Sequence, residues 1–354
     1  MSRFSNWIGI IKSIEDFTSY KVSIDKNYFH YKNIDFRFAF ERSMYFQIRG
    51  NFKVRFNFKY FIKKIIFSNL FFINNFLKIR NKTTTITNAD YLFVTIHHKF
   101  IRFLLPIYKK IDNSVFIICG DIEKSVKLCK DNNYRYIVMR QNAKISKKPN
   151  FDIVDLAILY ETIVSYISKI NPKSIIIPEG NSALYEVFNL ATEMRNDVKT
   201  ICIQQGWCPV VHNGFRNMHF DLFISWGRAF TLALEPFNKK QKFMSIGSHI
   251  LDVKTSETEK DSVSFFYQGE DSMIKKENNN EFFEFAIYLT KKYKNLNIII
   301  REHPDHQIES KLKRRLLQYK NIEFMNPSDF SLSDVLLRSK IVVSFFSTVL
   351  FEAI

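Results

Sequence analysis

The sequence predicts an α/β protein with two Rossmann-like, doubly wound domains, preceded by a basic segment rich in aromatic residues. Short apolar runs alternate with stretches of helical length from residue 89 onward. A second such series starts after the polar stretch DVKTSETEKD at 252–261, which reads as a linker. Alternation of strand and helix is typical of a parallel sheet with helices on both faces. The chain of 354 residues is long enough for two domains that each bury a core.

The overall composition excludes several classes of protein. Hydrophobic residues make up 46% and charged residues 25% of the chain, as in soluble globular proteins rather than disordered or membrane-spanning ones. The cysteines, Cys119, Cys129, Cys202 and Cys208, lack metal-ligand spacing, and His212 completes no second Cys–His pair. We therefore expect no metal and no cofactor. Because no signal peptide opens the chain, we also expect the reducing cytosol.

The first segment, residues 1–88, carries most of the positive charge. The formal net charge is +17, and this segment holds 16 Lys and Arg against 5 Asp and Glu, a net +11. From Arg49 to Lys82, nine basic residues and no acidic residue are interleaved with aromatic ones. The uncharged stretch Ile65–Leu77 is shorter than the ~20 residues of a spanning helix. It would lie on a bilayer rather than cross it.

Three interpretations of the stretch from Arg49 to Lys82 stay open. Its cations and rings can bind an anionic membrane surface, where the rings enter the headgroup boundary. They can also bind single-stranded nucleic acid, where bases stack on the rings. In the third interpretation the rings belong to a core and the lysines form a solvated face. Salt-dependent binding to single strands that is lost on deletion of residues 1–88 would favour nucleic acid.

The first Rossmann-like domain is predicted to span residues 89–251. Near-continuous apolar runs predict buried strands at Tyr91–Ile96, Ser114–Cys119, Tyr134–Met139, Ser174–Ile177, Lys199–Ile203 and Leu222–Ser225. Between them, the stretches Ile153–Ile170 and Ser182–Met194 have the length and apolar spacing of helices. In sheets of this kind, ligands bind at the carboxyl ends of the strands.

The second domain is predicted to span residues 262–354. Strands are expected at Ser264–Tyr267, Leu296–Ile300, Asn321–Met325 and Lys340–Phe345. Helices are expected at Glu281–Tyr293, Glu309–Tyr319 and Ser331–Arg338, and from Thr348 onward. Because the sequence stops within an apolar helical turn, we expect a fragment whose second domain is incomplete at its C-terminus.

The clearest local motif is Arg301-Glu302-His303-Pro304, directly after an apolar strand. Pro304 favours an extended conformation at His303, so the imidazole should project from the carboxyl edge of the sheet. Together with the Arg301 guanidinium, it could neutralise the phosphate of a departing nucleotide. The alternative is an ordinary turn with a solvated histidine.

A second motif supports this interpretation. Ser347-Thr348 follows a strand and opens a helix, with Ser347 expected as the N-cap, so free backbone N–H groups and two hydroxyls form an anion site. Ser344 at the strand end could supplement it, and Glu352, about one turn inside the helix, could accept hydrogen bonds from ribose. Simple capping and an exposed glutamate are the alternatives. Gly269 marks the turn after the first strand of this domain.

The third set lies in the first domain. Ile175-Ile176-Ile177-Pro178-Glu179-Gly180 ends a buried strand in a carboxylate, which could take the proton from an attacking hydroxyl. It could equally be a turn residue near a helix N-terminus. His97 and His98 end the first strand, and either could replace Glu179 as the base. Gln204 and Gly206 follow another strand and could line the same cleft.

Taken in order from about Asp90 to Ile354, these motifs resemble the GT-B glycosyltransferases of bacterial surface polysaccharide assembly. In capsule and lipooligosaccharide members, including sialyl- and polysialyltransferases, an acidic-acidic-glycine motif supplies the base. His-Pro and paired Ser/Thr motifs hold the nucleotide phosphate. The residues here that are similar to these three motifs are Glu179-Gly180, His303-Pro304 and Ser347-Thr348, with Pro178 where a second acid is expected.

Further likenesses extend to capsule and glycerophosphotransferase proteins. Those proteins carry a Gln-x-Gly turn, a Trp-Gly element and a strand ending in Gly-Ser. The similar elements here are Gln204-Gln205-Gly206, Trp226-Gly227 and Gly247-Ser248.

The resemblance implies a metal-independent, inverting transfer of a sugar from a nucleotide-sugar, with a CMP-sugar favoured, to a growing surface glycan. Glu179 would deprotonate the acceptor hydroxyl, while His303, Arg301 and the Ser347-Thr348 helix end stabilise charge on the phosphate. The expected partners are the donor, a glycan or lipid-linked acceptor and the inner-membrane surface, and not nucleic acid. We expect a cytoplasmic protein that is peripheral on the inner face of that membrane.

Three alternatives remain at this stage. One is a glycerophosphotransferase that uses a CDP-glycerol-type donor. Another is a basic protein that binds single-stranded nucleic acid, and a third is a non-catalytic assembly scaffold that retains the fold.

Overall fold

A computed structural model describes residues 3–49, 88–139, 153–206, 215–249, 260–270, 274–304, 306–345 and 347–353 of the chain. These residues form two compact units, Met1–Ile250 and Leu251–Ile354. The basic stretch from residue 50 to Lys82, the linker before Lys260, and Trp207, Cys208 and His212 lie outside the described residues. Nothing in the described part of the chain has both the length and the apolar character of a membrane-crossing helix.

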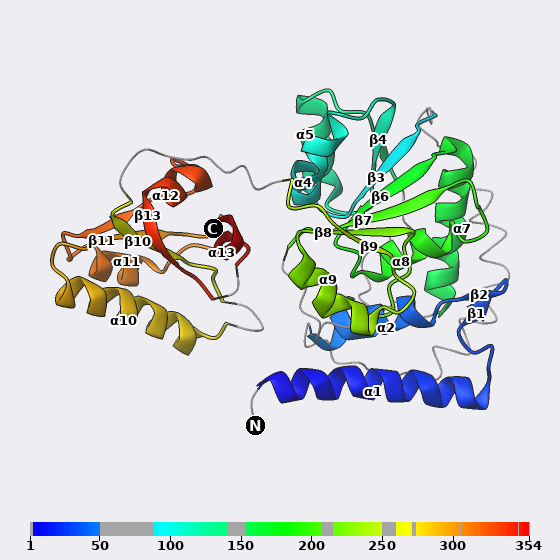
Figure 1. Ribbon diagram of the computed structural model, residues 1–354, viewed down its shortest axis with the longest axis horizontal. Helices are drawn as coiled ribbons and strands as arrows, with labels where there is room; N and C mark the ends of the chain where they lie inside the picture. The colour runs from blue at the N-terminus through cyan, green and yellow to red at the C-terminus, as the bar shows by residue number, and fades with distance from the viewer. Residues whose placement is uncertain are drawn as a thin grey trace. The chain divides into compact units, whose positions relative to one another are not determined.

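The first unit is built on a parallel sheet, seen with its covering helices in Figure 1. Within the described residues, its seven strands lie in the order β5-β4-β3-β6-β7-β8-β9. They are β3 (Tyr91–Thr95), β4 (Ser114–Ile118), β5 (Tyr136–Val138), β6 (Ser174–Pro178), β7 (Lys199–Ile203), β8 (Leu222–Ser225) and β9 (Phe243–Ser245). The chain runs outward from β3 through β4 to β5, then returns to β6 on the other side of β3. The point between β3 and β6 is therefore a topological switch point, where doubly wound sheets bind ligands.

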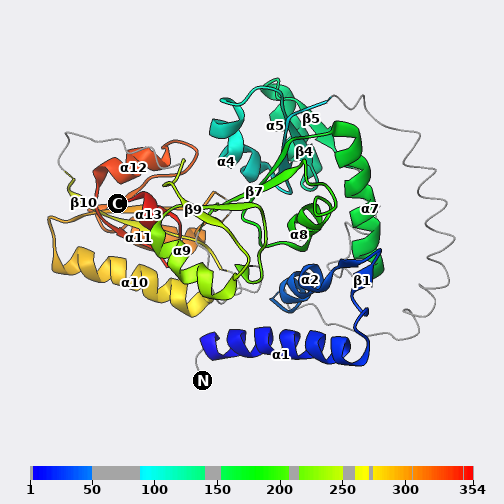
Figure 2. The same cartoon turned by 45° about the vertical axis from the view of Figure 1, so that its right-hand side comes forward.

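Helices cover both faces of this sheet. Alternate strand residues point to opposite faces, so the apolar side chains on both faces are buried. They are α4 (His98–Tyr108), α5 (Ile122–Asp131), α7 (Ile153–Ile170), α8 (Ala183–Leu190) and α9 (Arg228–Leu234), followed by a short 3-10 turn at Glu235–Phe237. Leu92 and Val94 of β3 pack in the core under α7 and α8, while Phe93 packs in a separate core under α4 and α5. Figure 2 shows α7 and α8 against the sheet.

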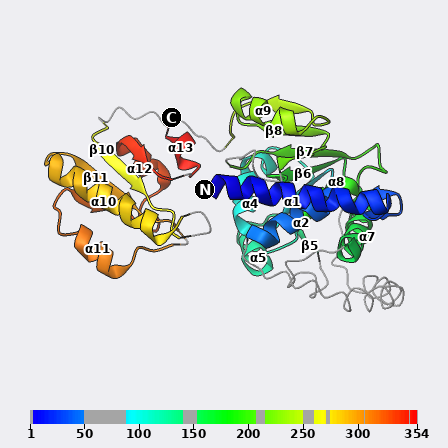
Figure 3. The same ribbon diagram turned by 90° about the horizontal axis from the view of Figure 1, so that it is seen from below.

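The N-terminal residues belong to this unit. Helix α1 (Arg3–Ile24), a hairpin of β1 (His30–Tyr31) and β2 (Ile34–Asp35), and α2 (Arg37–Arg49) come first, and α1 lies along α2 (Figure 3). Phe29, Phe36 and Phe40 are buried in the same core as α7 and α8. These three rings of the N-terminal region therefore serve packing in the first unit.

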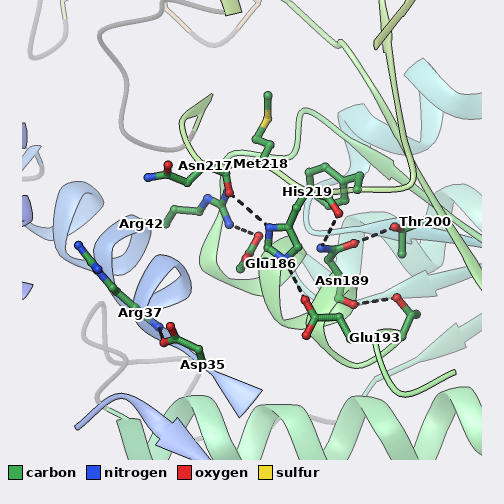
Figure 4. A network of polar contacts seen from close by, with 12 residues as sticks. Asp35, Arg37, Arg42, Glu186, Asn189, Glu193, Thr200, Asn217, Met218 and His219 are labelled. Atoms are coloured by element: carbon green, nitrogen blue, oxygen red, sulfur yellow. Dashed lines mark hydrogen bonds and ion pairs between the residues drawn. The ribbon is translucent and has the colours of Figure 1, made fainter. Parts of the chain in front are cut away.

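A buried polar network fixes α2 to α8 (Figure 4). The Arg42 guanidinium on α2 pairs with the Glu186 carboxylate on α8, and both side chains are 1% exposed. Arg42 also donates to the carbonyl of Arg216 at 3.4 Å. His219 Nε2 lies 3.5 Å from Glu186 and 3.1 Å from Glu193. Although burial alone would lower the pKa of His219, the two carboxylates raise it overall.

The second unit has the same plan on a smaller scale. Its described strands lie in the order β12-β11-β10-β13, all parallel. They are β10 (Ser262–Phe266), β11 (Asn297–Arg301), β12 (Ile322–Phe324) and β13 (Ser339–Val343), and the helices are α10 (Lys276–Lys292), α11 (Ser310–Leu316), α12 (Leu332–Arg338) and α13 (Val349–Glu352). Ile298 and Ile300 pack under α10 and α11, whereas Ile299 packs under α12 and α13. The switch point lies between β10 and β13.

The predicted α/β class and the two Rossmann-like units are confirmed, with three local differences. Strand β9 precedes Gly247-Ser248, where the likeness implies a strand, but its bounds were not predicted, because a strand of three residues with Met244 half exposed gives no apolar run. Helix α10 begins at Lys276 instead of Glu281, because its polar first turn hides the helical period. The N-cap of α13 is Thr348 rather than Ser347. Ser347, one residue before this N-cap, accepts a hydrogen bond from Val349 N–H on its hydroxyl at 3.3 Å.

Candidate active site

The carboxyl ends of β4, β3 and β6 lie side by side in the first unit, with the switch point between β3 and β6. Strand β3 pairs with β4 on one side and β6 on the other, so the segments that follow these strands lie on one edge. They carry His97 and His98 after β3, Asp121 after β4, and Glu179 after β6. Parallel pairing thus gathers two imidazoles and two carboxylates, separated by up to 82 positions in sequence, at the edge where such sheets bind ligands.

Glu179 occupies a strained turn. Gly180 N–H donates to the carbonyl of Pro178 at 2.9 Å, and the φ of Glu179 is +69°, which defines a γ-turn of the rarer, strained form. Its own N–H donates to Ile203 of β7 at 2.9 Å, which ties the turn to the sheet. A residue other than glycine is held in this region only where the surrounding structure compels it, and such residues cluster at functional sites.

Gly180 allows the turn at Glu179 to pack closely against Cys202 and Phe220. Its φ is +71°, and a Cβ there would lie 2.6 Å from Cys202 Sγ and 2.9 Å from the ring of Phe220. Only glycine allows both the left-handed conformation and this close packing. The sequence motif Glu-Gly therefore has a physical basis, because the glycine seats the turn that presents Glu179.

A buried phenol lies beneath this turn. Tyr185 on α8 is fully buried, and its hydroxyl finds no hydrogen-bond partner among the described residues. Burial, together with the nearby Glu179 carboxylate, raises the pKa of Tyr185 well above its ordinary value. The phenol is therefore held neutral, with a proton available to donate.

His98 and Asp121 form a hydrogen-bonded pair. His98 Nδ1 bonds to Asp121 Oδ2, and the His98 backbone N–H donates to the same oxygen at 3.4 Å. His97 Nε2 lies 3.7 Å from Asp121 Oδ2, and the two imidazole rings are 4.3 Å apart. Burial and the neighbouring His98 lower the pKa of His97. Although burial acts to raise it, the hydrogen bonds from His98 lower the pKa of Asp121.

These three side chains have the composition of a divalent-metal site, since one ligand atom from each lies within 4.8 Å of the others. The hydrogen bonds argue against that use. Lys99 N–H donates to His97 Nδ1 at 3.2 Å, so neutral His97 carries its proton on Nε2, the atom that faces Asp121. A metal would need the lone pair of that nitrogen. The donor set therefore fits proton transfer better than metal binding.

Gln204 and Gly206 at the end of β7 have a structural role in this unit. Gln204 is fully buried; its Nε2 donates to the carbonyl of Gly206 at 3.0 Å, and its Oε1 accepts from Trp226 N–H at 2.8 Å. The side chain thus joins the ends of β7 and β8.

In the second unit, Arg301 ends β11 but is directed into the protein. It is 8% exposed, and Nη1 donates to the carbonyl of Phe330, just before α12, at 2.9 Å. Burial lowers the pKa of its guanidinium. This arrangement assigns Arg301 to anchoring the loop before α12.

His303 and His306 close a turn next to Gly269. His306 N–H donates to the carbonyl of His303 at 3.1 Å, with Pro304 in the second position of the turn, and the two imidazole rings are 5.2 Å apart. Gly269 has a φ of +83°, and a Cβ there would lie 2.6 Å from His306 Cβ. The loop after β10 and the loop after β11 are therefore in direct contact, and only glycine permits it.

The hydroxyls after β13 face the other side of β10. Ser344 Oγ donates to the carbonyl of Phe266 at 3.1 Å and lies 3.3 Å from Gln268 Oε1. Thr348 Oγ1 lies 3.4 Å from Glu352 Oε1, and burial raises the pKa of Glu352. The Thr348 and Glu352 side chains are thus engaged with each other.

The structure places His303 and the Ser347-Thr348 pair at the same edge but on opposite sides of β10. Gly269, at the end of β10, lies between them in strand order. Sequence reasoning missed Asp121, Tyr185 and His306. Asp121 could have been found from Gly120-Asp121 at the end of the second apolar run, which repeats the Gly-plus-carboxylate signal of Glu179-Gly180.

Neither a protein-family model nor a curated protein sequence matches the chain. A UDP-GlcNAc 2-epimerase from Methanocaldococcus jannaschii matches in structure with a TM-score of 0.50 and 13% identity, over 74% of this chain and 80% of that one. The epimerase from Neisseria meningitidis, bound to UDP-GlcNAc, gives 0.47 and 12%, over 71% and 76%. MurG from Acinetobacter baumannii gives 0.44 and 10%, over 72% of each chain. At 13% identity, the likeness to the Methanocaldococcus jannaschii enzyme shows the fold alone, two Rossmann-like units of the GT-B type.

Proposed function

We propose that this protein transfers a sugar from a nucleotide-sugar to an acceptor hydroxyl. The observation that carries the proposal is the pair of switch points. In the second unit, Gly269 and the Ser347-Thr348 turn flank the point between β10 and β13. In the first unit, two imidazoles and two carboxylates follow β3, β4 and β6. The second edge has groups suited to a phosphate, and the first has groups suited to moving a proton.

The second unit is the proposed donor-binding unit. The His306 side chain fills the space that the missing Cβ of Gly269 leaves, and its ring is 5.2 Å from that of His303, so two imidazoles lie together where the loops after β10 and β11 meet. When protonated, an imidazole here stabilises the charge that develops on the departing nucleotide phosphate. On the other side of β10, the Ser347 hydroxyl accepts from Val349 N–H at 3.3 Å and keeps its own proton to donate to a phosphate.

The first unit is the proposed acceptor-binding unit. Glu179 and His98 are the two candidates for the group that deprotonates the acceptor hydroxyl. Glu179 is the candidate favoured by the family resemblance, and its strained turn supports a functional role. Neither candidate base needs a metal ion in order to act. The proposed transfer therefore depends on fixed dipoles and on proton transfer to a side chain.

The finer features of the proposal rest on the motif likeness and the charge of the chain. They are a CMP-sugar donor, inversion at the anomeric carbon, a growing capsule or lipooligosaccharide acceptor, and attachment of the basic residues 49–82 to the inner face of the cytoplasmic membrane. Glycerol phosphate transfer from a CDP-linked donor is the neighbouring activity. Epimerisation of a nucleotide-sugar is a second candidate, because proteins of the same fold include UDP-GlcNAc 2-epimerases.

Nucleotide binding tests the proposal. The full chain is titrated with CMP, CDP, UDP and GDP by isothermal calorimetry, together with His303→Ala and the control His30→Ala, since His30 is exposed and belongs to neither edge. We expect one of the nucleotides to bind, and we expect His303→Ala to weaken it about tenfold or more, as for loss of a charge-assisted hydrogen bond. Absence of binding by all four nucleotides would refute the proposal, and equal affinity in His303→Ala would remove the proposed role of that histidine.

A further inference from the structure

We propose that His98 is the group that takes the proton from the acceptor hydroxyl, and that Asp121 positions it. This inference rests on the proposed function, because it names the base of that reaction. It assigns Glu179 a role other than proton acceptor. The argument depends on which nitrogen of each imidazole is free.

The Asp121 carboxylate fixes both the ring and the backbone of His98. Its Oδ2 bonds to His98 Nδ1 and accepts from the His98 backbone N–H at 3.4 Å. A carboxylate that accepts from Nδ1–H leaves the lone pair of neutral histidine on Nε2. His98 is therefore held in the tautomer that a general base needs, with Nε2 as the proton-accepting atom.

Asp121 is held in place by the fold and not by a helix cap. It occupies the N-cap position of α5, yet its side chain makes no capping hydrogen bond, and its φ is +43°. Before it, a Cβ on Gly120 would lie 2.5 Å from the carbonyl oxygen of Ile96. The loop after β4 is thus pressed against the loop after β3 at a backbone contact that only glycine allows. This strained, glycine-dependent contact delivers the carboxylate to His98.

His97 is excluded from the same role by its own hydrogen bonds. As N-cap of α4, its Nδ1 accepts from Lys99 N–H at 3.2 Å, so its neutral form carries the proton on Nε2. Its Nε2 faces Asp121 at 3.7 Å. Neither nitrogen of neutral His97 is then available to accept a proton. The adjacent imidazole instead adds to the electrostatic environment of the pair.

The His98–Asp121 pair is partly exposed to solvent. The side chains of His98 and Asp121 are 23% and 22% exposed, between the limits of a core pair and a solvated one. Both follow strands at the carboxyl edge beside the β3–β6 switch point.

The proposed step balances in atoms and charge. The acceptor oxygen forms a bond to the anomeric carbon as the bond from that carbon to the nucleotide phosphate oxygen breaks. The hydroxyl proton moves to His98 Nε2, and the electron pair of the broken bond leaves with the nucleotide. Asp121 stabilises the imidazolium, which returns its proton to water after the product leaves.

Nitrogen-15 NMR of histidine-labelled full-length protein tests the pair without any ligand. At a pH where the ring is neutral, we expect the His98 signals, assigned with His98→Gln, to show protonation on Nδ1. In Asp121→Asn we expect the proton to redistribute toward Nε2, while His30→Gln leaves the His98 signals unchanged. A His98 ring protonated on Nε2 in the wild-type protein, or one that is insensitive to Asp121→Asn, would overturn the inference.

Turnover then tests the role in proton transfer. Release of UDP from UDP-GlcNAc and of CMP from CMP-N-acetylneuraminic acid is followed against pH. For the donor that is used, we expect His98→Gln to lose about 10²- to 10⁴-fold in kcat, Asp121→Asn about 10- to 100-fold, and KM to change little. The acidic limb of the pH profile should persist in His97→Asn and vanish in His98→Gln.

The outcomes separate the inference from the proposed function. If the wild-type protein releases neither nucleotide and binds none, the proposed function fails and the inference fails with it. If nucleotide is released but His98→Gln keeps the wild-type rate and pH profile, the inference alone is overturned. Loss of turnover in Glu179→Gln together with an unaffected His98→Gln would return the role of base to Glu179.

Discussion

Removal of Arg42 should destabilise the first unit in a manner that depends on pH. The Arg42–Glu186 pair is 1% exposed on both sides and joins α2 to α8. Arg42→Met keeps most of the apolar volume but leaves the Glu186 carboxylate buried without its guanidinium. Breaking a buried pair in this way costs about 3–5 kcal/mol, because the remaining charge is uncompensated.

The structure sets the direction of the pH dependence. His219 Nε2 lies 3.5 Å from Glu186, and its pKa is raised in the folded protein. Protonated His219 therefore stabilises the fold below its unfolded pKa of about 6.5, and this contribution is lost as the pH rises through the folded pKa. In Arg42→Met the imidazolium compensates Glu186 in part, so the cost at pH 6 should be about 1–2 kcal/mol smaller than at pH 8.5.

Urea unfolding followed by tryptophan fluorescence measures this cost. Trp226 is buried in the first unit, and the second unit, Leu251–Ile354, contains no tryptophan in its sequence, so the signal follows the first unit. The double variant Arg42→Met/Glu186→Leu should recover most of the loss, because neither charge remains buried. Lys32→Met, which breaks a pair between the exposed Lys32 and the partly buried Glu161, is the control and should cost at most about 1 kcal/mol.

Two results would refute this reasoning. One is a cost of Arg42→Met below about 1 kcal/mol at pH 8.5, which would mean that α2 is not fixed to α8 by the pair. The other is an equal cost at both pH values, which would show that His219 does not compensate the orphaned carboxylate.

Two glycine substitutions test the turns that build the two edges. Gly180→Ala should lower the free energy of unfolding in urea by about 2–5 kcal/mol, because of its left-handed φ and the 2.6 Å approach of its Cβ to Cys202 Sγ. Gly247→Ala is the control, with a φ of +88° and no atom within 4 Å, and should cost only about 1–2 kcal/mol. Equal costs would contradict the packing argument. Gly269→Ala should weaken nucleotide binding in calorimetry at least about tenfold by displacing His306, while the extended and open Gly227→Ala should leave it unchanged; unchanged affinity in Gly269→Ala would contradict the placement of the donor.

The two Rossmann-like units could be predicted because their central strands are buried on both faces. The centres of these strands, such as residues 115–118 and 298–300, are then continuously apolar, and they alternate with helical stretches. The bounds of strand β9 could not be predicted from an apolar pattern, because it is a short edge strand whose side chains are largely exposed. The packing of residues 3–49 on the first unit was equally hidden, since Phe29 and Phe36 could serve a core or a surface with the same sequence.

The positions of the candidate site residues could be predicted from the sequence more readily than their roles. Strand ends mark where side chains gather, so His98, Glu179 and His303 could be singled out. Their hydrogen-bond partners come from other strands, and no local pattern reveals them. Asp121 lies 23 residues from His98, and its contact depends on the backbone approach at Gly120. The inward turn of Arg301 depends on a carbonyl 29 residues away.

The fate of an intact nucleotide-sugar tests the central claim most directly. The full-length protein is incubated with CMP-N-acetylneuraminic acid and, separately, with UDP-GlcNAc, in the presence of oligosaccharide acceptors, and all products are identified by mass spectrometry. The account predicts free nucleotide in amounts equal to the sugar gained by the acceptor, with both lost in His98→Gln. A donor that is isomerised without release of nucleotide, or one that is recovered unchanged with no acceptor modified, would contradict it.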